Sequence, residues 1–237
     1  MLRARIRLVS LALGCLALWH SGAWSAAFED TMAQRTLACT ACHGSQGKAG
    51  PDGYFPRLAG KPDGYLYNQL VNFREGRRHY PLMEDLLAPL SDRYLRDIAA
   101  YFSALDVPYA PPSPAAASEA MLARGKTLAM RGDASLGLPA CTQCHGSALT
   151  GVAPHIPGLL GLPRDYLNAQ LGGWKTGQRH AVAPDCMAEI AGKLGAPDVN
   201  AVAHWLSLQP VPQPGRATTV RPVLPSSAPH IACGSAP

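Results

Sequence analysis

Apolar side chains recur at helical spacing in two stretches of the chain that lie 101 residues apart. The matching positions are Leu66, Leu70 and Phe73 in the first stretch and Leu167, Leu171 and Trp174 in the second. A proline that suits a first helical turn precedes each stretch, and a glycine that suits a helix end follows it. These signals predict one helix between Pro62 and Gly76 and another between Pro163 and Gly177.

A second pair of helices is expected further along. Residues 91–105 show an amphipathic pattern behind a capping Ser91, and residues 196–208 are their counterpart. Tyr101 and Trp205 fall at matching positions, and we interpret both as core residues. The same order of helices therefore occurs twice.

The repetition covers whole domains. The segments that align are 57–70 with 158–171, and 73–79 with 174–180. Because both alignments share one register without a gap, they indicate a duplicated domain. We place the first domain at 28–107 and the second at 118–210.

Three segments belong to neither domain. Residues 1–27 have a basic start, an apolar stretch and small residues at the end, which predicts a signal peptide and export to the periplasm. A retained membrane anchor is the alternative, although the twelve apolar residues fall short of the roughly 20 that span a bilayer. The linker at 108–117 is rich in proline and alanine and should act as a semi-rigid spacer. The proline-rich tail at 211–237 has no amphipathic period, so we expect it to be extended or disordered.

Net charge excludes one class of partner. The chain has 21 basic and 16 acidic residues, and without the three arginines of the signal peptide the balance is 18 − 16 = +2. That balance is not typical of a nucleic-acid-binding protein. Docking to a protein partner should therefore depend on local patches.

The strongest chemical signal is the sequence C-x-x-C-H, which occurs twice. The residues are Cys39, Cys42 and His43 in the first copy and Cys141, Cys144 and His145 in the second. Two thiols within one helical turn can add to the vinyl groups of one haem, and the adjacent histidine is then placed to bind the iron. A structural zinc would need both pairs to converge on one ion, and a thioredoxin-like pair would need alternating strands and helices. The motifs therefore predict two covalently bound c-type haems.

The second axial ligand of each iron decides between electron transfer and catalysis. His79 and His180 occupy equivalent positions and make a bis-histidine arrangement one candidate. Met83 and Met187 each lie seven residues before the leucine that leads into the last helix of their copy. A thioether in a loop opposite the histidine suits a stable electron carrier, so we favour the methionines.

These residues together resemble a known family. The order of five motifs is similar to that of a class I cytochrome c. The motifs are C-x-x-C-H-G, F-P-R-L-A-G, Y-L-Y-N-Q-L-V-N-F-R-E-G-R-R, a methionine before L-S-D and finally I-A-A-Y-F. Two such domains in tandem resemble the dihaem cytochrome c-four family. The resemblance implies an all-α fold of two class I cytochrome c domains that passes electrons between redox partners.

The resemblance also implies roles for individual residues. Thioether bonds would involve Cys39, Cys42, Cys141 and Cys144, with His43 and His145 as proximal ligands and Met83 and Met187 as distal ligands. Pro56 and Pro157 match the family's proline whose carbonyl holds the proximal imidazole. The partners implied are a redox donor and acceptor, such as a terminal oxidase or a dehydrogenase, with the protein attached to the periplasmic face of the inner membrane if the signal is retained.

The family pattern stops beyond Pro210, and two further features of the second half are not explained by it. Cys186 and Cys233 are left over once Cys15 leaves with the signal, and in an oxidising compartment they are a candidate disulfide that would tie the tail to the second domain. His155 lies near the second haem crevice, where we expect a solvated loop histidine.

Three functions remain open on these residues. The leading hypothesis is an electron carrier that transforms no substrate. A cytochrome subunit of a larger dehydrogenase or oxidase is the first alternative. A dihaem peroxidase is the second, and it would need a vacant iron position with acid and base groups such as His155, His180 or Glu189.

Overall fold

The computed structural model describes residues 29–50, 53–112, 116–223 and 231–236. The predicted signal peptide at 1–27 lies outside the described residues. Within them, no helix is long and apolar enough to cross a membrane.

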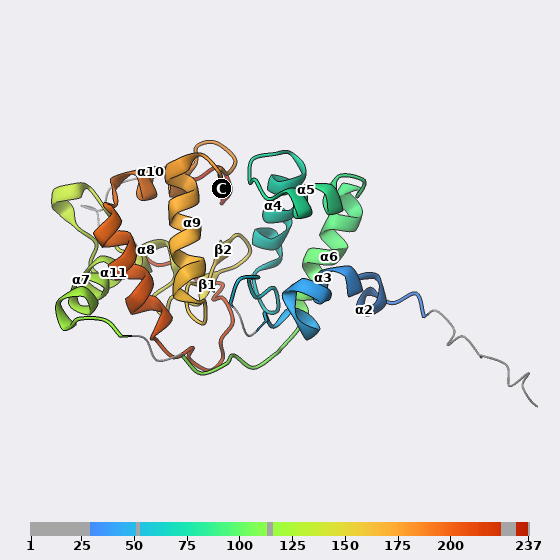
Figure 1. Ribbon diagram of the computed structural model, residues 1–237, viewed down its shortest axis with the longest axis horizontal. Coiled ribbons are helices and arrows are strands. Elements are labelled where there is room, and N and C mark those ends of the chain that lie inside the picture. The colour runs from blue at the N-terminus through green and yellow to red at the C-terminus, as the bar shows by residue number, and fades with distance from the viewer. Residues whose placement is uncertain (1–28, 51–52, 113–115, 224–230, 237) are drawn as a thin grey trace, which may run out of the picture. The chain divides into compact units, whose positions relative to one another are not determined.

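Helices form nearly all the regular structure of the described residues. The first half contains α2 (Met32–Arg35), α3 (Leu37–His43), the 3₁₀ turn η1 (Ser45–Gly47), α4 (Asp63–Arg74), α5 (Pro81–Leu87) and α6 (Asp92–Ala104). The second half contains α7 (Glu119–Met130), η2 (Ala134–Leu136), α8 (Thr142–His145), α9 (Arg164–Thr176), α10 (Cys186–Lys193) and α11 (Ala196–Ser207). One two-stranded antiparallel sheet pairs β1 (Gly151–Val152) with β2 (Ile156–Pro157). The predicted all-α fold class is confirmed (Figure 1).

Helices α4, α6, α9 and α11 lie where the apolar periodicity places them, whereas α7 was not predicted from the sequence. Pro62 and Pro163 are the N-cap residues of α4 and α9. Ser91 caps α6 by accepting a hydrogen bond from the backbone N–H of Tyr94 at 3.3 Å. Gly177 caps α9 at a φ of 75°, in the left-handed region that glycine adopts without strain.

Each copy of the repeat has its own buried core. Helix α4 packs against α5 and α6, and the buried residues of this core are Leu66, Phe73, Leu87, Leu95, Ile98, Ala99 and Phe102. Helix α11 packs against α7 and α9 around a second core, which extends from Leu128 to Leu206. The two cores share no buried residue, and Figure 1 shows α2 to α6 on one side of the view and α7 to α11 on the other.

The methionines proposed as ligands lie on short helices, not in the loops that we expected. Met83 is in the first turn of α5, and Met187 is in the first turn of α10. Asp185 caps α10 by accepting from the backbone N–H of Ala188 at 3.1 Å. Seven or eight residues form no stable helix alone, so these helices depend on packing that the local pattern does not reveal.

The described part of the linker contacts both copies. Arg57 donates hydrogen bonds to the carbonyls of Pro108, at 3.1 Å, and Val107. Its guanidinium lies 3.9 Å from the ring centroid of Tyr109. On the other side this ring lies against Gly161, where an added Cβ would come within 2.3 Å of it. The segment around Tyr109 is therefore fixed, as a semi-rigid spacer should be.

The described part of the tail is extended and hydrogen-bonded. Thr218 forms a parallel bridge with Val152, and its backbone exchanges bonds with Gly151 and Ala153 at 3.0 and 2.8 Å. Arg216 donates to the carbonyl of Ala104 at 3.2 Å. The tail thus contacts residues from both halves of the repeat.

Candidate functional site

The two thiols of each motif lie next to a helix that ends at the motif's histidine. Cys39 and Cys42 are on α3, whose last residue is His43. In the second copy Cys141 precedes α8, and His145 is the last residue of that helix. All four cysteines have free thiols, and burial raises the pKa of Cys141 to about 11. Each site therefore offers two unpaired sulfurs within one turn.

The two motif histidines are held in the same way. The Nδ1 atom of His43 lies 2.8 Å from the carbonyl oxygen of Pro56, and that of His145 lies 2.7 Å from the carbonyl oxygen of Pro157. Both side chains are 7% exposed. Because a carbonyl only accepts, Nδ1 carries the proton and Nε2 keeps its lone pair for a metal.

Burial also keeps these imidazoles neutral. Desolvation lowers the pKa of His43 and His145, and the hydrogen bond to the proline carbonyl opposes that effect in part. A neutral imidazole with Nδ1 already bonded can bind iron only through Nε2.

A glycine after each histidine turns the chain back toward the proline. Gly44 has a φ of 75° and Gly146 a φ of 85°. A Cβ at Gly44 would come within 2.4 Å of the carbonyl oxygen of Ala49, so a larger residue would block the turn. We assigned no role to these glycines from the sequence, although their presence in both copies of C-x-x-C-H-G was the available signal.

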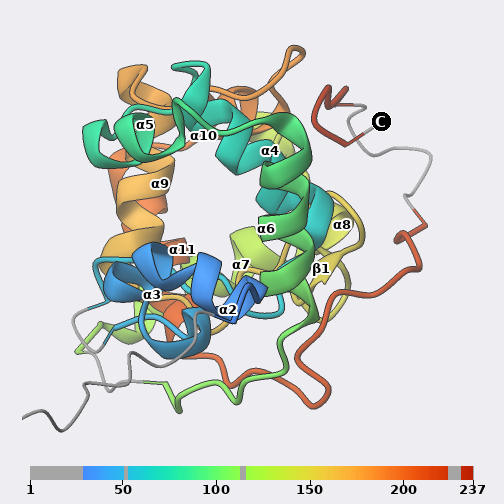
Figure 2. The same ribbon diagram turned by 90° about the vertical axis from the view of Figure 1, so that its right-hand side faces the viewer.

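A cavity of about 2430 Å³ contains both sets of residues. It is lined by the motif residues of each copy and by Met83 and Met187. Ligand sites of single small molecules measure roughly 300–1,000 Å³, so this volume suits two large groups. Figure 2 shows α3, α4, α5 and α6 placed around a common central region, and each of the helices α2 to α6 contributes lining residues.

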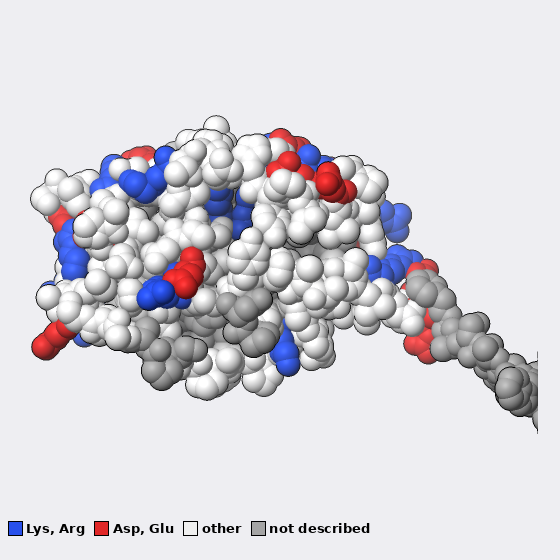
Figure 3. Space-filling view, in the orientation of Figure 1, with Lys and Arg blue, Asp and Glu red and all other residues white. Residues whose placement is uncertain are grey.

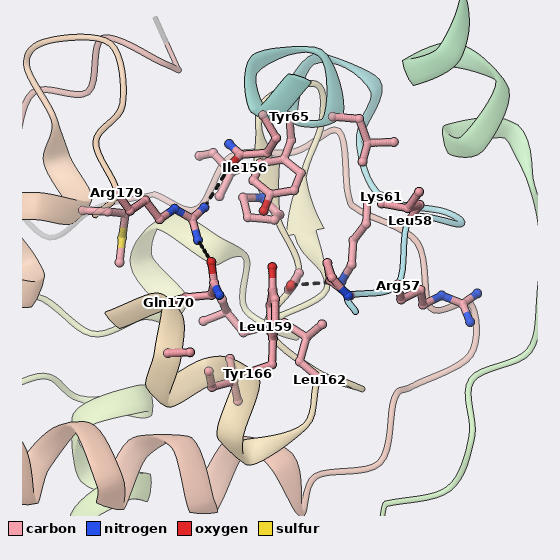
Figure 4. A pocket seen from close by; sticks show the side chains of 18 of the residues that line it. Arg57, Leu58, Lys61, Tyr65, Ile156, Leu159, Leu162, Tyr166, Gln170 and Arg179 are labelled. Carbon is pink, nitrogen blue, oxygen red and sulfur yellow. Dashed lines mark hydrogen bonds between the residues drawn. The ribbon is translucent and has the colours of Figure 1, made fainter. Parts of the chain in front are cut away.

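The lining is also positively charged. Eight basic residues line it, Arg35, Lys48, Arg57, Lys61, Arg78, Arg164, Arg179 and Arg221, against two acidic ones, Asp165 and Asp185. Lys61 is 4% exposed, and its Nζ donates to the carbonyl of Gly158 at 3.2 Å. Burial, with Arg57 as a second cause, lowers its pKa to about 8. Figure 4 shows Lys61 and Arg179 reaching into the same region from different parts of the chain.

A buried ammonium group is costly unless it meets an anion. The haem periphery carries two carboxylates, so the cations of the lining suit this group, as do the paired thiols and the neutral imidazoles. The residues present therefore fit two haems.

Other candidate ligands are placed less favourably. His79 and His180 are both exposed, and their backbone N–H groups donate to Gln178 and Arg77 at 2.8 and 2.6 Å. His79 borders the cavity, whereas His180 does not. His155 is half-buried, not solvated as we expected, and its Nδ1 lies where a Cβ on Gly64 would be 2.5 Å away. Packing against α4 explains this difference.

A disulfide joins Cys186 to Cys233. Next to it, Gly234 donates to the carbonyl of Pro184 at 2.9 Å, and Asn68 donates to the carbonyl of Ser235 at 3.0 Å. The end of the tail is thereby held beside Met187 and against α4 of the first copy.

The surface charge and the placement of metal-ligating side chains give two further observations. Figure 3 shows basic and acidic residues interspersed over one face, without a broad area of one sign. Among the described residues no group of three or more His, Cys, Asp and Glu side chains is arranged to hold a metal ion, so the two cysteine pairs do not converge on one.

Comparison with known proteins agrees with this geometry. No protein-family model matches the chain. A thiosulfate dehydrogenase electron acceptor of Thiomonas intermedia is 37% identical over 199 residues, covering 84% of this chain and 88% of the relative. A cytochrome c4 of Pseudomonas aeruginosa is 34% identical over 200 residues, covering 83% and 94%. The solved structure of reduced cytochrome c4 from Pseudomonas stutzeri has a TM-score of 0.64 and 32% identity, covering 74% of this chain and 95% of the other.

The fold and the two equivalent sites are those of a dihaem c-type cytochrome. The chain belongs to the cytochrome c4 family, and it is an electron-transfer protein with two covalently bound c-type haems. The predicted family, fold, cofactors and electron-transfer function are confirmed.

Proposed function

We propose that this chain is an exported carrier that takes electrons from a dehydrogenase and transforms no substrate itself. A relative of this chain is named as the electron acceptor of a thiosulfate dehydrogenase, which supports a dehydrogenase as donor. The basic and apolar start of the sequence supports export to the periplasm. The proposed domains remain 28–107 and 118–210.

We further propose the ligand set of each haem. Cys39 and Cys42 attach the first haem and Cys141 and Cys144 the second, with His43 and His145 as proximal ligands. The observation that carries this assignment is the pair of Nδ1 contacts to Pro56 and Pro157, at 2.8 and 2.7 Å, which leave only Nε2 for iron.

Met83 and Met187 complete the two sites in this proposal. Both border the cavity, and each lies in the first turn of a short helix. A bound haem would supply a one-electron ferric–ferrous couple, and ligation by a methionine together with a histidine would raise its potential. The chain's own part is to keep each imidazole neutral and oriented, to surround the site with apolar side chains and to hold the two sites together.

Replacing each methionine tests the ligand set. In Met83→Ala and Met187→Ala proteins, we expect one of the two haems to lose the weak far-red absorption of methionine-ligated ferric haem. The matched control is Met121→Ala, since Met121 on α7 does not border the cavity. An unchanged spectrum in both ligand variants would point to His79 and His180 instead.

The choice between carrier and enzyme has its own measurement. A carrier should be low-spin at both ferric haems and should be reduced stoichiometrically, two electrons per chain, by a dehydrogenase supplied with its substrate. High-spin ferric haem at either site, together with turnover of hydrogen peroxide, would support the peroxidase alternative instead.

A further inference from the structure

Four side chains from equivalent positions of the repeat meet where the two copies touch. Gln69 on α4 matches Gln170 on α9, and Arg78 matches Arg179, each pair 101 residues apart. Arg78 donates to Gln69 Oε1 at 3.0 Å and to Gln170 Oε1 at 2.7 Å. Arg179 donates to Gln69 Oε1 at 3.0 Å and also to Gln170 Oε1 (Figure 4). We call these residues the arginine–glutamine quartet.

The backbone repeats this exchange. Arg78 and Arg179 form an antiparallel bridge, flanked by the hydrogen bonds from His79 to Gln178 and from His180 to Arg77. Arg78 of the first copy thus contacts Gln170 of the second, and the equivalent Arg179 of the second copy contacts Gln69 of the first. Contacts of this kind are self-complementary, as in a twofold-symmetric dimer, and they specify one register.

The quartet places two like charges together inside the protein. Arg179 is 7% exposed, and burial and then the charge of Arg78 lower its pKa. Each guanidinium also lies over an aromatic ring of its own copy, Arg78 at 4.4 Å from the Phe73 centroid and Arg179 at 3.9 Å from that of Trp174. The shared acceptors are neutral amides, so the arrangement is not a simple ion pair between the copies.

The four side chains border the cavity that holds both sites. A planar guanidinium with several fixed donors can bridge two acceptors at once, which a lysine ammonium cannot do with the same geometry. The quartet is therefore suited to fixing the distance and orientation between the two motifs.

We propose that Arg78 and Arg179 are positioning residues for electron exchange between the two haems. This inference rests on the proposed function, because it requires a haem at each motif. With a haem at each motif, the exchange would be the transfer of one electron between the two groups, with no bond broken and no proton moved. The rate of such a step falls steeply with distance, so a contact that fixes the register of the copies sets the rate.

The test uses the double variant Arg78→Gln/Arg179→Gln in the holoprotein. Glutamine is shorter than arginine and lacks the forked guanidinium, so it should not bridge the two amide oxygens, and the shared register of the copies should weaken. After partial reduction by a radical pulse, we expect exchange between the haems to slow several-fold, because the rate of electron transfer falls with the distance between the two groups. Haem content should stay at two per chain by pyridine haemochrome assay, because the four cysteines that attach the haems are unchanged.

Arg77→Gln is the matched control. It removes the same charge from the same loop, but the Arg77 side chain bonds Asn72, at 2.7 Å, and Glu75 within its own copy. We expect its exchange rate to stay close to wild type. An equal loss in the control would mean that charge, not register, is responsible, and no loss in the double variant would overturn the proposal.

Two further variants, both at Gln170, distinguish loss of the contact from misfolding. Gln170→Glu keeps an acceptor at the same place and turns its bonds from both arginines into charge-assisted ones, so the rate should be retained. Gln170→Ala should slow exchange in the same direction as the arginine variants. A wild-type protein without two low-spin haems would count against the proposed function. If both haems are intact and every quartet variant exchanges electrons at the wild-type rate, that result would count against this inference alone.

Discussion

Single residues determine how closely the helices of the second copy approach each other. Gly125 on α7 is buried, and a Cβ built on it would lie 2.1 Å from the carbonyl oxygen of Ala201 on α11. Backbone lies on the far side of that contact, so no flexible side chain can move away. The same kind of constraint acts at Gly44, where the chain turns after the first motif. Such glycines are needed for space, which a sequence pattern of apolar residues does not reveal.

Gly125→Ala should therefore destabilise the protein. Forcing α7 away from α11 resembles overpacking of a core, which costs about 1–3 kcal/mol and occasionally more. The free energy of unfolding from denaturant titration measures the effect.

Gly172→Ala is the matched control, because this glycine lies inside α9 with no atom within 4 Å of an added Cβ. Alanine there should stabilise the helix by about 0.5–1 kcal/mol. If both variants changed stability by the same amount and sign, close packing at Gly125 would not be the cause.

At the level of elements, helices α4, α6, α9 and α11 and the motifs could be predicted, whereas α7, the short helices and the hydrogen bonds of the tail could not. Leu66, Leu70 and Phe73 predict α4, because its 12 residues are enough to show a helical period. Helices α5 and α10 are too short to show one, so Met83 and Met187 were expected in loops. The contacts of Thr218 and Ser235 with distant residues depend on tertiary structure, which no local pattern encodes.

The disulfide gives the tail a measurable role. It closes a loop between Cys186 and Cys233, which are 47 residues apart, and a native disulfide typically stabilises by about 2–4 kcal/mol. Cys186→Ser/Cys233→Ser should lower the free energy of unfolding by an amount in that range. Because Gly234 and Ser235 then lose their anchor, limited proteolysis near the C-terminus should become faster.

The comparison for this prediction is Cys233→Ser alone, which also opens the bridge but leaves Cys186 next to Met187. Equal stability of the double variant and wild type would show that the tail stays bound without its covalent link.

The whole molecule combines two separate cores with one shared cavity. The cores built around Leu95 and Val202 have no buried residue in common, so each copy can pack without the other's haem. The cavity, by contrast, takes lining residues from both copies. Folding is therefore divided between the copies, whereas the environment of the haems is shared.

Removing one attachment site should remove one haem only. In Cys39→Ser/Cys42→Ser, the second motif with Cys141, Cys144 and His145 is unchanged, and its core does not depend on the first. We expect one c-type haem per chain by pyridine haemochrome assay, with a low-spin ferric spectrum. A chain without any haem would show that the copies depend on each other far more than their packing indicates.

The contact formed by Gln69, Arg78, Gln170 and Arg179 has a consequence for how such a chain can arise. Each copy offers the other the donors and acceptors that it receives in return. A shorter ancestral polypeptide with a single glutamine and a single arginine at these places would find the same partner surface on another molecule of itself. Gene duplication would then have converted an intermolecular association, dependent on protein concentration, into a permanent one within a single chain.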